Sequence, residues 1–592
     1  MKKKLIFAAI TTLFLSSAIV FGANETFADT TVNISASDLQ KNARRAINNA
    51  LTNAKDKATS GNKYIIKIPS GEYSLDACLY IYGNTTLDLE GVTLKRGANA
   101  AGKDASGLIH IGDSSDNSAE TGATGYFYEN IAIKGGVIDG NAKSATILKA
   151  AHVKNFSMTG TTLQNNLSGH LMEVAGVNGL TITNCTFKDQ VLQKSDSEAR
   201  YEAIQFDVIY KKHFSTYRSE ALSVNNVRIS GCQFINVPRG IGSHTDILNV
   251  PCKNIEITGN TFEDIMNCAV HGQNWENVTI AGNTIKDAPR GIVMYSHRDS
   301  GKSTYLASVI MEEGGLKSDI PEENEENDDM NIVIKNNTME LDMGKKELFS
   351  DYTRTGIVVG GTTVTSSTVY SDKSGGLPVG DYYISGVKIS GNTISTHGHG
   401  IRAVMAKNVV IDNNLVNGDY DISDGTNYYG IQASERSKDI TITNNTVDGS
   451  NSNGIYVLTM KKESDRTTAK KVTGNTVKNC KKYGIDIEKA DVTDVTKNTI
   501  SDSKETGIFV YNTAIVKNLN QNKVKNSGKR GISVTKKAIA TNIKSNTVTS
   551  PGEYGILLSL KSEATTIASN KVKGATTKDV HVSSDCKAKT LR

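Results

Sequence analysis

Short segments of alternating apolar and polar residues recur along the chain, and most of them repeat one phrase. The phrase reads GIYV at Gly454, GIFV at Gly507 and GISV at Gly531, and a motif containing Asn-Thr-aliphatic lies between successive copies. Alternation over four residues is typical of a β-strand, and the Gly and Asn residues between the segments favour turns. The pattern therefore predicts a protein built from many short strands, without a repeated amphipathic helix.

The spacing of the repeated Asn defines the size of one structural unit. The Asn falls at positions 475, 498, 522, 546 and 570, so successive copies are 23 or 24 residues apart. A unit of this length fits three short strands per turn of a coil, and turns stacked in parallel lie about 4.8 Å apart. We predict apolar columns inside the coil and a ladder of Asn side chains at one corner, each amide bonded to the next.

The chain after the first residues has a different pattern. Apolar residues at 39, 43, 47 and 51 form a stripe with helical spacing, and Ser or Asp residues precede it as caps. We predict a helix over 37–56 that covers the open first turn, because an exposed parallel edge promotes aggregation. Residues 29–62 are thus the capping segment, and 63–592 the coil, with insertions around 187–220, 298–330 and 361–385.

Residues 1–28 have the features of a secretory leader. Three Lys precede an apolar run from Leu5 to Phe21, and the segment ends at Ala28 in a small-residue cleavage pattern. Cleavage after Ala28 predicts a secreted, extracellular protein; an uncleaved anchor is the alternative, because the apolar run is long. No later stretch of the sequence is long and apolar enough to span a membrane.

Charge and cysteine content argue against two further classes of protein. The formal net charge is +5, and removing residues 1–28 takes away three Lys and one Glu and leaves +3, which argues against nucleic acid as the main partner. Seven Cys spread from Cys78 to Cys586 form neither a disulfide framework nor a zinc motif. Cys185 and Cys232 share one repeat position, which indicates two small buried residues stacked on each other.

The repeat breaks between about residues 170 and 300. In the regular turns the third place after the Gly is aliphatic, as at Val457. Upstream, our alignment puts polar residues in that place: Glu173, Gln205, Ser243 and His271. Burying an unpaired carboxylate is costly, so this column is either a fully hydrogen-bonded stack or the lining of an open groove. Insertions that would form walls, and half of the ten His, fall on these turns and favour the groove.

The carboxylates of this region are the first candidates for acid–base chemistry. Glu202 and Asp207, in YEAIQFD, form the main pair, and Glu173 or Asp246 is the alternative partner. Glycosidic cleavage uses one carboxyl to protonate the leaving oxygen and a second as base or nucleophile. Residues five apart on a straight strand point to opposite faces, so Glu202 and Asp207 can act together only if the chain bends between them.

Other side chains on the same turns are candidates for catalysis or for binding a substrate. His244 and His271 can act as acid or base, or donate to a sugar oxygen. Arg can hold sugar carboxylates or hydroxyls, and aromatic rings can stack on sugar faces. The candidates for substrate binding are Arg239, Asp246, Gln205, Gln273, Trp275, Arg290, Tyr295 and His170. No run of residues has the spacing of a calcium loop, and we predict no bound metal.

Several motifs together resemble the right-handed parallel β-helix proteins of the pectin-lyase-like superfamily: the capping helix, IPSGEY (68–73), GGVIDGN (135–141) and the Asn-cornered repeats. The resemblance covers essentially the whole mature chain. It implies an all-β fold, a single-stranded right-handed parallel β-helix with an N-terminal capping α-helix, and a carbohydrate ligand on one flank. It does not fix the activity, because this superfamily includes lyases, glycosidases, epimerases, tailspikes and adhesins.

We therefore expect an exported carbohydrate-active enzyme, foremost a glycoside hydrolase that acts on a polysaccharide or complex glycan through paired carboxylates. A polysaccharide lyase or epimerase is the first alternative, and only a lyase would call for calcium as a cofactor. A non-catalytic glycan-binding or adhesive β-helix is the second alternative. Clustered ionisable groups favour the enzyme, whereas evenly spread polar rungs would favour the adhesin. The expected partner is a carbohydrate polymer or glycan, and the expected state is a monomer.

Overall fold

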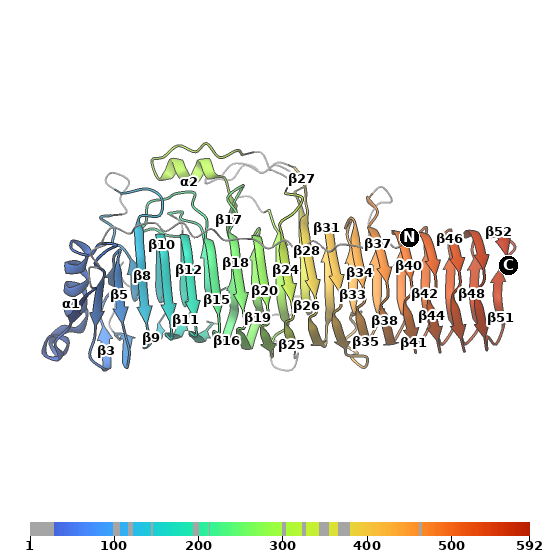
Figure 1. Ribbon diagram of the computed structural model, residues 1–592, viewed down its shortest axis with the longest axis horizontal. Helices are drawn as coiled ribbons and strands as arrows, with labels where there is room; N and C mark the ends of the chain where they lie inside the picture. The colour runs from blue at the N-terminus through green and yellow to red at the C-terminus, as the bar shows by residue number, and fades with distance from the viewer. Residues whose placement is uncertain are drawn as a thin grey trace, which may run out of the picture.

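The protein is a long rod of stacked parallel strands, and the chain advances from one end to the other (Figure 1). The computed structural model describes residues 29–98, 107–116, 122–143, 146–192, 201–211, 213–298, 303–322, 327–341, 354–364, 379–460 and 465–591. Fifty of the strands in this part form one continuous hydrogen-bonded network, and nearly all of its pairs are parallel. The predicted right-handed parallel β-helix is confirmed, whereas the predicted leader lies outside the described residues.

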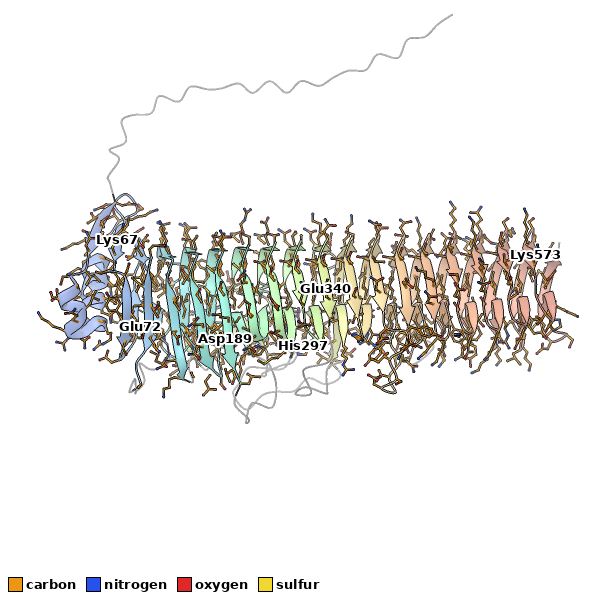
Figure 2. The ribbon with its side chains drawn as sticks, turned by 90° about the horizontal axis from the view of Figure 1, so that it is seen from below. Lys67, Glu72, Asp189, His297, Glu340 and Lys573 are labelled. Atoms are coloured by element: carbon orange, nitrogen blue, oxygen red, sulfur yellow. The ribbon has the colours of Figure 1, made fainter. Side chains whose placement is uncertain are left out.

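Side chains alternate between the inside and the outside of the coil, as expected for short strands. Inward positions form aliphatic columns: Ile455, Ile485, Ile508 and Ile532 are paired in register from turn to turn and are fully buried. Outward side chains project along the whole rod, from Lys67 near one end to Lys573 near the other (Figure 2). The core is therefore one continuous apolar column rather than a globular centre.

The helix α1 (Ala36–Lys55) covers the first turn, close to the predicted range of 37–56. The hydroxyl of Ser35 accepts from the backbone N–H of Asp38 at 3.2 Å and caps its start. Asn48 ties the helix to the coil, because its amide donates to the carbonyl of Cys78 at 3.0 Å. No helix among the described residues is long and apolar enough to cross a membrane.

The predicted Asn ladder is present, and it extends further upstream than the regular turns. Each side-chain oxygen accepts from both the backbone N–H and the side-chain amide of the Asn one turn earlier, as between Asn498 and Asn522, where both distances are 3.0 Å. The members are Asn260, Asn283, Asn337, Asn392, Asn414, Asn445, Asn475, Asn498, Asn522, Asn546 and Asn570. Cys232 and Cys185 continue the same position toward the N-terminus, both buried, as predicted.

Replacing Asn522 with Ala is expected to lower the free energy of unfolding by about 1–3 kcal/mol, because several buried backbone and amide groups lose their partner. Asn522 accepts two bonds from Asn498 and donates to the carbonyl of Val495 at 2.9 Å. Chemical denaturation measures the change. The control is Asn542→Ala, a half-buried Asn outside this ladder, which should cost clearly less. Equal losses of unfolding free energy in the two variants would show that the ladder does not contribute specifically to stability.

Two insertions pack on the outside of the coil and on each other. From the insertion around 187–220, Ile209, Phe214 and Tyr217 pack over Ala151 and Ala175 of the outer surface. From the insertion around 298–330, the helix α2 (Ala307–Glu313) packs in a cluster that includes residues of the first insertion. Both lie on the same side of the rod (Figure 1). Most of the predicted insertion around 361–385 lies outside the described residues.

One outer surface carries most of the predicted site residues, and we call it the flank face. It is the outward side of a series of paired strands: β12 (Met172–Thr183), β14 (Glu202–Asp207), β16 (Gln233–Gly242), β19 (Thr261–Gln273), β22 (Arg290–Ser296), β26 (Thr355–Val364), β30 (His399–Val404), β33 (Ile431–Ser434), β36 (Ile455–Leu458), β39 (Ile485–Glu488), β42 (Thr506–Tyr511), β45 (Arg530–Thr535) and β48 (Tyr554–Ser559). The two insertions cover its N-terminal part.

Candidate functional site

The register of the flank strands corrects the alignment made from the sequence. Ile204 pairs with Ile241, and unbroken pairings link this inward position to Ile455 in the regular turns. Gln205 therefore shares its column with Tyr456, not with Val457. Because strand side chains alternate, a shift of one residue moves a side chain to the opposite face. Glu173, Gln205 and His271 consequently lie on the outside of the coil, and their predicted place in the aliphatic column is wrong.

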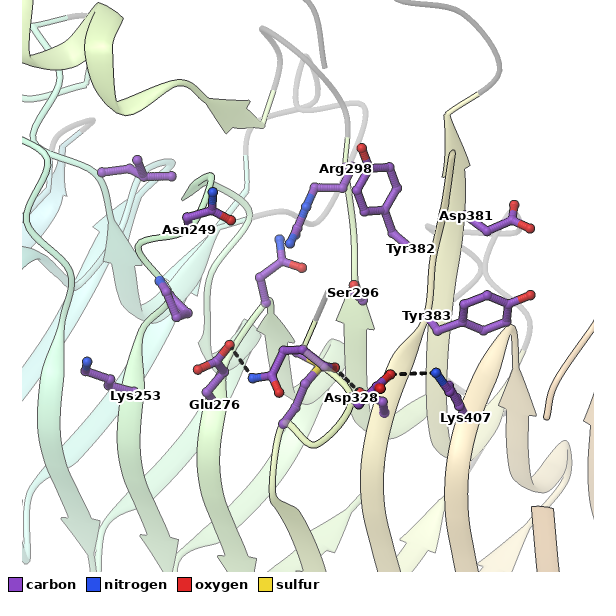
Figure 3. A pocket seen from close by; sticks show the side chains of 16 residues that line it. Asn249, Lys253, Glu276, Ser296, Arg298, Asp328, Asp381, Tyr382, Tyr383 and Lys407 are labelled. Atoms are coloured by element: carbon purple, nitrogen blue, oxygen red, sulfur yellow. Dashed lines mark hydrogen bonds and ion pairs between the residues drawn. The ribbon is translucent and has the colours of Figure 1, made fainter. Parts of the chain in front are cut away.

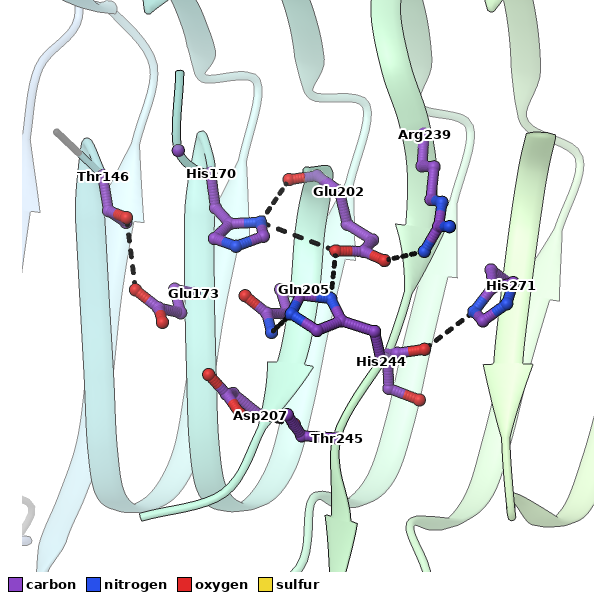
Figure 4. Close-up of polar contacts among 12 residues, drawn as sticks. Thr146, His170, Glu173, Glu202, Gln205, Asp207, Arg239, His244, Thr245 and His271 are labelled. Carbon is purple, nitrogen blue, oxygen red and sulfur yellow. Dashed lines mark hydrogen bonds and ion pairs between the residues drawn. The ribbon is translucent and has the colours of Figure 1, made fainter. Parts of the chain in front are cut away.

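Glu202 is the centre of the polar contacts on this face (Figure 4). Its side chain is fully buried; one oxygen accepts from Arg239 Nη1 at 2.9 Å, and the other lies 3.1 Å from His244 Nδ1. Burial alone would raise the pKa of Glu202, but the positive charges of His244 and Arg239 outweigh burial and hold that pKa well below its usual range. Glu202 is therefore ionised and paired, so it has no proton to give to a leaving oxygen.

His244 is an ionisable residue of this patch that keeps contact with solvent, since its side chain is 30% exposed. Burial lowers the pKa of His244, but the negative charge of Glu202 and the hydrogen bond to it raise the pKa above its ordinary value. Its Nε2 lies 3.4 Å from the amide nitrogen of Gln205. The ring of His170 lies 5.9 Å away and is buried; its Nδ1 is 2.9 Å from the backbone carbonyl oxygen of Glu202. His244 is thus oriented from one side and open on another.

Asp207 lies on the same side as Glu202, since both residues contact the loop that carries His244 (Figure 4). Asp207 accepts from Thr245 Oγ1 at 2.5 Å and from the backbone N–H of Val208 at 2.7 Å. Burial raises the pKa of Asp207, but neighbouring His charges and these two bonds lower it overall. Asp207 is 4% exposed, so it is an ionised, internally bonded group.

Glu173 and His271 are each held by a neighbouring turn. Glu173 is 5% exposed and forms an ion pair with Lys149 at 2.9 Å. His271 Nδ1 lies 2.7 Å from the carbonyl oxygen of Ser243 and donates to it, because a carbonyl oxygen can only accept. Burial, followed by the charge of Arg239, lowers the pKa of His271 well below its usual value, so the ring is neutral. The neutral ring of His271 is half-buried, so it retains some contact with solvent.

Three predicted substrate-binding residues are engaged in buried internal bonds. Asp246 accepts from Gln273 Nε2 at 2.6 Å and from Thr304 Oγ1 at 2.9 Å, which joins the coil to the second insertion. Burial raises the pKa of Asp246. Arg290 donates to the side chain of Asn267 and is 5% exposed. The structure therefore places Asp246, Gln273 and Arg290 among contacts that hold the turns together.

Trp275 lies inside the coil, so its predicted role as a stacking platform for sugars is wrong. Its side chain is fully buried, its indole N–H donates to Ser243 Oγ at 2.9 Å, and its ring lies 5.1 Å from that of Phe206. Ser243 and Gly272 leave space in the inward column, and the indole fills it; a Cβ on Gly272 would lie 2.9 Å from the ring. Tyr295, in contrast, is half-buried on the flank face, 6.1 Å from His271, and remains a candidate for a ligand contact.

A polar pocket of about 390 Å³ lies beside the flank face, and we call it the loop pocket (Figure 3). Asn274 and Ser296, which line it, directly follow Gln273 and Tyr295, so the two surfaces adjoin. Its other lining side chains include Lys253, Glu276, Arg298, Asp328, Tyr383 and Lys407. Lys253, Glu276 and Lys407 lie at or near the starts of β18 (Lys253–Thr258), β20 (Glu276–Ala281) and β31 (Ala406–Asp412). Sequence reasoning missed this pocket, because it considered only the strands of the flank face.

Internal bonds hold the walls of the loop pocket in place. Lys407 Nζ lies 2.5 Å from Asp328, and Glu276 accepts from the amide of Asn327 at 2.8 Å. The guanidinium of Arg298 lies 5.4 Å from the ring centre of Tyr382. Three basic and three acidic side chains line the pocket: Lys253, Arg298, Lys407, Glu276, Asp328 and Asp381. The pocket thus combines balanced charge, amides and tyrosine rings.

Comparisons with known proteins agree with the architecture. The NosD family model, described as periplasmic copper-binding protein, matches residues 382–536 and 463–591. Plasmin and fibronectin-binding protein A of Streptococcus pneumoniae (strain ATCC BAA-255 / R6) is 25% identical over 288 residues, which are 44% of this chain and 39% of that protein. The chain therefore spans well under half of the length of this relative.

Solved structures of two kinds are similar in fold. The Streptococcus pneumoniae surface protein and adhesin PfbA is 17% identical, with 82% of this chain and 98% of that chain covered and a TM-score of 0.45. The tailspike protein of E. coli bacteriophage HK620, in complex with a pentasaccharide, is 15% identical, with 91% and 77% covered and a TM-score of 0.43.

The matched family is described as copper-binding, and we therefore looked for a metal site in the described part of the chain. There, no group of three or more His, Cys, Asp or Glu is placed to hold a metal ion. By its strand pairing and capping helix the chain is a right-handed parallel β-helix, and its C-terminal part matches the NosD family model.

Proposed function

We propose that this protein is an exported β-helix that binds a glycan on the flank face and in the loop pocket without cleaving it. One observation carries the proposal: the carboxylates predicted to act as acid and base are buried and bonded to internal partners. Glu202 is bonded to Arg239 and His244, and Asp207 to Thr245. Their lowered pKa values keep both ionised, whereas glycosidic cleavage requires a carboxylic acid that retains its proton.

The groups that do meet solvent suit a sugar. A glycan offers hydroxyls to polar side chains and an apolar C–H face to an aromatic ring. Tyr383 supplies a half-buried ring to the loop pocket, beside amides, carboxylates and cations, and Tyr295 supplies a half-buried ring on the adjoining flank face. Because the charged side chains of the pocket are balanced in number, a neutral glycan suits it better than a strongly acidic one. The relative named for binding plasmin and fibronectin adds support for an adhesive role.

Tyr383→Ala and Tyr295→Ala are each expected to weaken glycan binding by about 2- to 12-fold, because each removes a ring contact of about 0.5–1.5 kcal/mol. A broad panel of immobilised neutral and acidic glycans identifies the ligand, and titration with that ligand measures the affinity. The matched control is Tyr420→Ala, a half-buried Tyr on another face, which should leave binding unchanged. Absence of binding to the whole panel, or equal losses in all three variants, would refute the proposal.

Acid–base catalysis through His244 is a second candidate function. The observation in its favour is that Glu202 orients the ring at 3.1 Å while the side chain stays 30% exposed. A carboxylate that positions an imidazole in this way is a common arrangement in acid–base sites. Under this alternative, the bound glycan would be broken down over time and His244→Ala would stop the breakdown without abolishing binding.

A further inference from the structure

The flank face continues past the candidate site, over turns that looked regular in the sequence. The outward column that contains Gln205 extends through the C-terminal turns as Arg402, Gln432, Tyr456, Asp486, Phe509, Ser533 and Leu557. A neighbouring outward column carries Glu488 and Tyr511, which pair in register. The inward columns of the same strands are aliphatic, so any specific chemistry of these turns lies on this outer surface.

Aromatic rings gather on this stretch in two groups, Tyr429 with Tyr456 and Tyr483 with Phe509 and Tyr511, and we call these five residues the aromatic strip. Ring centres are 4.9 Å apart for Tyr429 and Tyr456, 4.5 Å for Tyr483 and Phe509, and 5.0 Å for Phe509 and Tyr511. Tyr429, Tyr483 and Tyr511 are only half-buried, so each offers part of a ring to a ligand. Aromatic residues form 6% of the chain, which makes their gathering on one face of adjacent turns a distinct feature.

A buried acid within the strip has an incomplete set of hydrogen bonds. Asp486 lies between Tyr456 and Phe509 in the register and is 3% exposed. Its Oδ2 accepts from the amide of Asn453 at 2.9 Å, whereas its Oδ1 has no hydrogen-bond partner among the described residues. Leaving such an atom unbonded costs about 1–3 kcal/mol. Next to it, the hydroxyl of Tyr456 donates to Glu488 at 2.6 Å, so polar groups alternate with rings along the strip.

This combination suits a polysaccharide better than a peptide. The backbone groups of β36, β39 and β42 already pair with the turns on either side, so an extended peptide has no free edge to join. Sugars present C–H faces to rings and hydroxyls to carboxylates and amides. Turns of the coil are about 4.8 Å apart, which is close to the advance of one pyranose ring in an extended chain. Successive sugars can therefore keep step with successive turns.

We propose that the aromatic strip extends the glycan site, so that a neutral polysaccharide held at the loop pocket continues along the rod over Tyr429, Tyr483 and Tyr511. This inference rests on the proposed function and adds the form of the ligand: a long, extended chain. Six turn-to-turn pairings separate β22, which carries Tyr295, from β42, which carries Tyr511. The distance is about 29 Å along the axis, so a short oligosaccharide at the pocket does not reach the end of the strip.

The test compares affinity with chain length on the full chain. The probes are length-graded xylan, cellulose and chitin oligosaccharides with the corresponding soluble polymers, titrated against the wild type, Tyr483→Leu, Tyr511→Leu and the Tyr420→Ala control. Leu keeps the apolar packing and removes the flat ring, and thermal melting confirms that each variant is folded. We expect the wild-type affinity to rise at least about 10-fold once the chain spans about 29 Å. The two Leu variants should lose most of that gain and bind short chains normally.

The outcomes separate this inference from the proposed function. The proposed role of the aromatic strip is wrong if the wild-type affinity does not rise with chain length. It is also wrong if both Leu variants keep that rise. Neither result contradicts the short-chain site. Loss of short-chain affinity in the Leu variants also contradicts the strip, because it would show that these rings act through the fold or the pocket. A wild type that binds none of the three series refutes the inference as stated, and the wider glycan panel then decides the proposed function independently.

Discussion

Replacing Arg239 with Ala is expected to lower the free energy of unfolding by about 3–5 kcal/mol, because it leaves the fully buried carboxylate of Glu202 without its main permanent cation. The pair lies at 2.9 Å with both side chains almost wholly excluded from solvent. His244 can compensate only in its protonated form. Denaturant unfolding at neutral pH measures the loss. Arg290→Ala is the matched control, since Arg290 occupies the same column of the flank face but bonds to a neutral Asn267.

The pH dependence of this loss follows from the sign of the pKa shift. The pKa of Glu202 is lowered in the fold, so its pairing contributes stability above the unfolded value of about 4.3 and loses it as the pH falls. The penalty of Arg239→Ala should therefore shrink below about pH 4, where the unfolded carboxyl is protonated. Adding Glu202→Gln to the variant should recover part of the stability at neutral pH. If the loss of unfolding free energy in Arg239→Ala is small, or equals that in Arg290→Ala at every pH, the buried pair does not stabilise these turns.

Trp275→Ala is expected to cost about 3–5 kcal/mol, because it removes the side chain that fills the coil beside Ser243 and Gly272. The large neighbours Phe206 and Met294 are already packed in the coil, so they could close the cavity only by shifting. Trp275→Phe should cost less, since it keeps part of the volume and loses the bond to Ser243. Thermal and denaturant unfolding measure both. A loss below about 1 kcal/mol for Trp275→Ala would mean that the indole is not a core residue and would reopen its role as a ligand platform.

Most of the architecture could be predicted because its signals repeat. The 24-residue spacing, the aliphatic phrase and the Asn recur in many turns, so errors in one copy are corrected by the others. The capping helix α1 carries a complete set of local signals, from Ser35 at its cap to the buried stripe at Leu39 and Leu51. The Asn ladder followed from the same repetition, and the structure extended it upstream to Asn260.

The place of the polar residues could not be read correctly from one irregular phrase. We aligned Glu202 with the repeated Gly, whereas the register gives that place to Ala203, opposite Gly240. The place is crowded: a Cβ on Gly240 would lie 2.5 Å from the carbonyl oxygen of Ala269 and from the ring of Phe262. Only small residues fit there. That steric rule, applied to the sequence, would have chosen Ala203 and placed the acids outside the coil.

The burial of the acidic side chains could also not be predicted from the sequence, because it depends on segments that do not repeat. Phe214 and Tyr217 of the first insertion fold over the flank face, and α2 packs against that insertion. Together with the adjacent coils of the helix, these contacts partly enclose the flank face. The same surface after β30 carries the aromatic strip, in which Tyr429, Tyr483 and Tyr511 keep partial contact with solvent. Its residues fall at a variable position of the repeat, which gives no signal in a single sequence.

The central claim is that the flank face binds a glycan and leaves it intact. The most direct measurement incubates the full chain with a polymeric glycan that it binds and follows that polymer for many hours by size-exclusion chromatography, by reducing-end assay and by the absorbance of unsaturated uronides. The account predicts retained binding, an unchanged chain length, no new reducing ends and no new absorbance. Shortening of the polymer that disappears in His244→Ala would contradict it and show that the Glu202–His244 pair is catalytic.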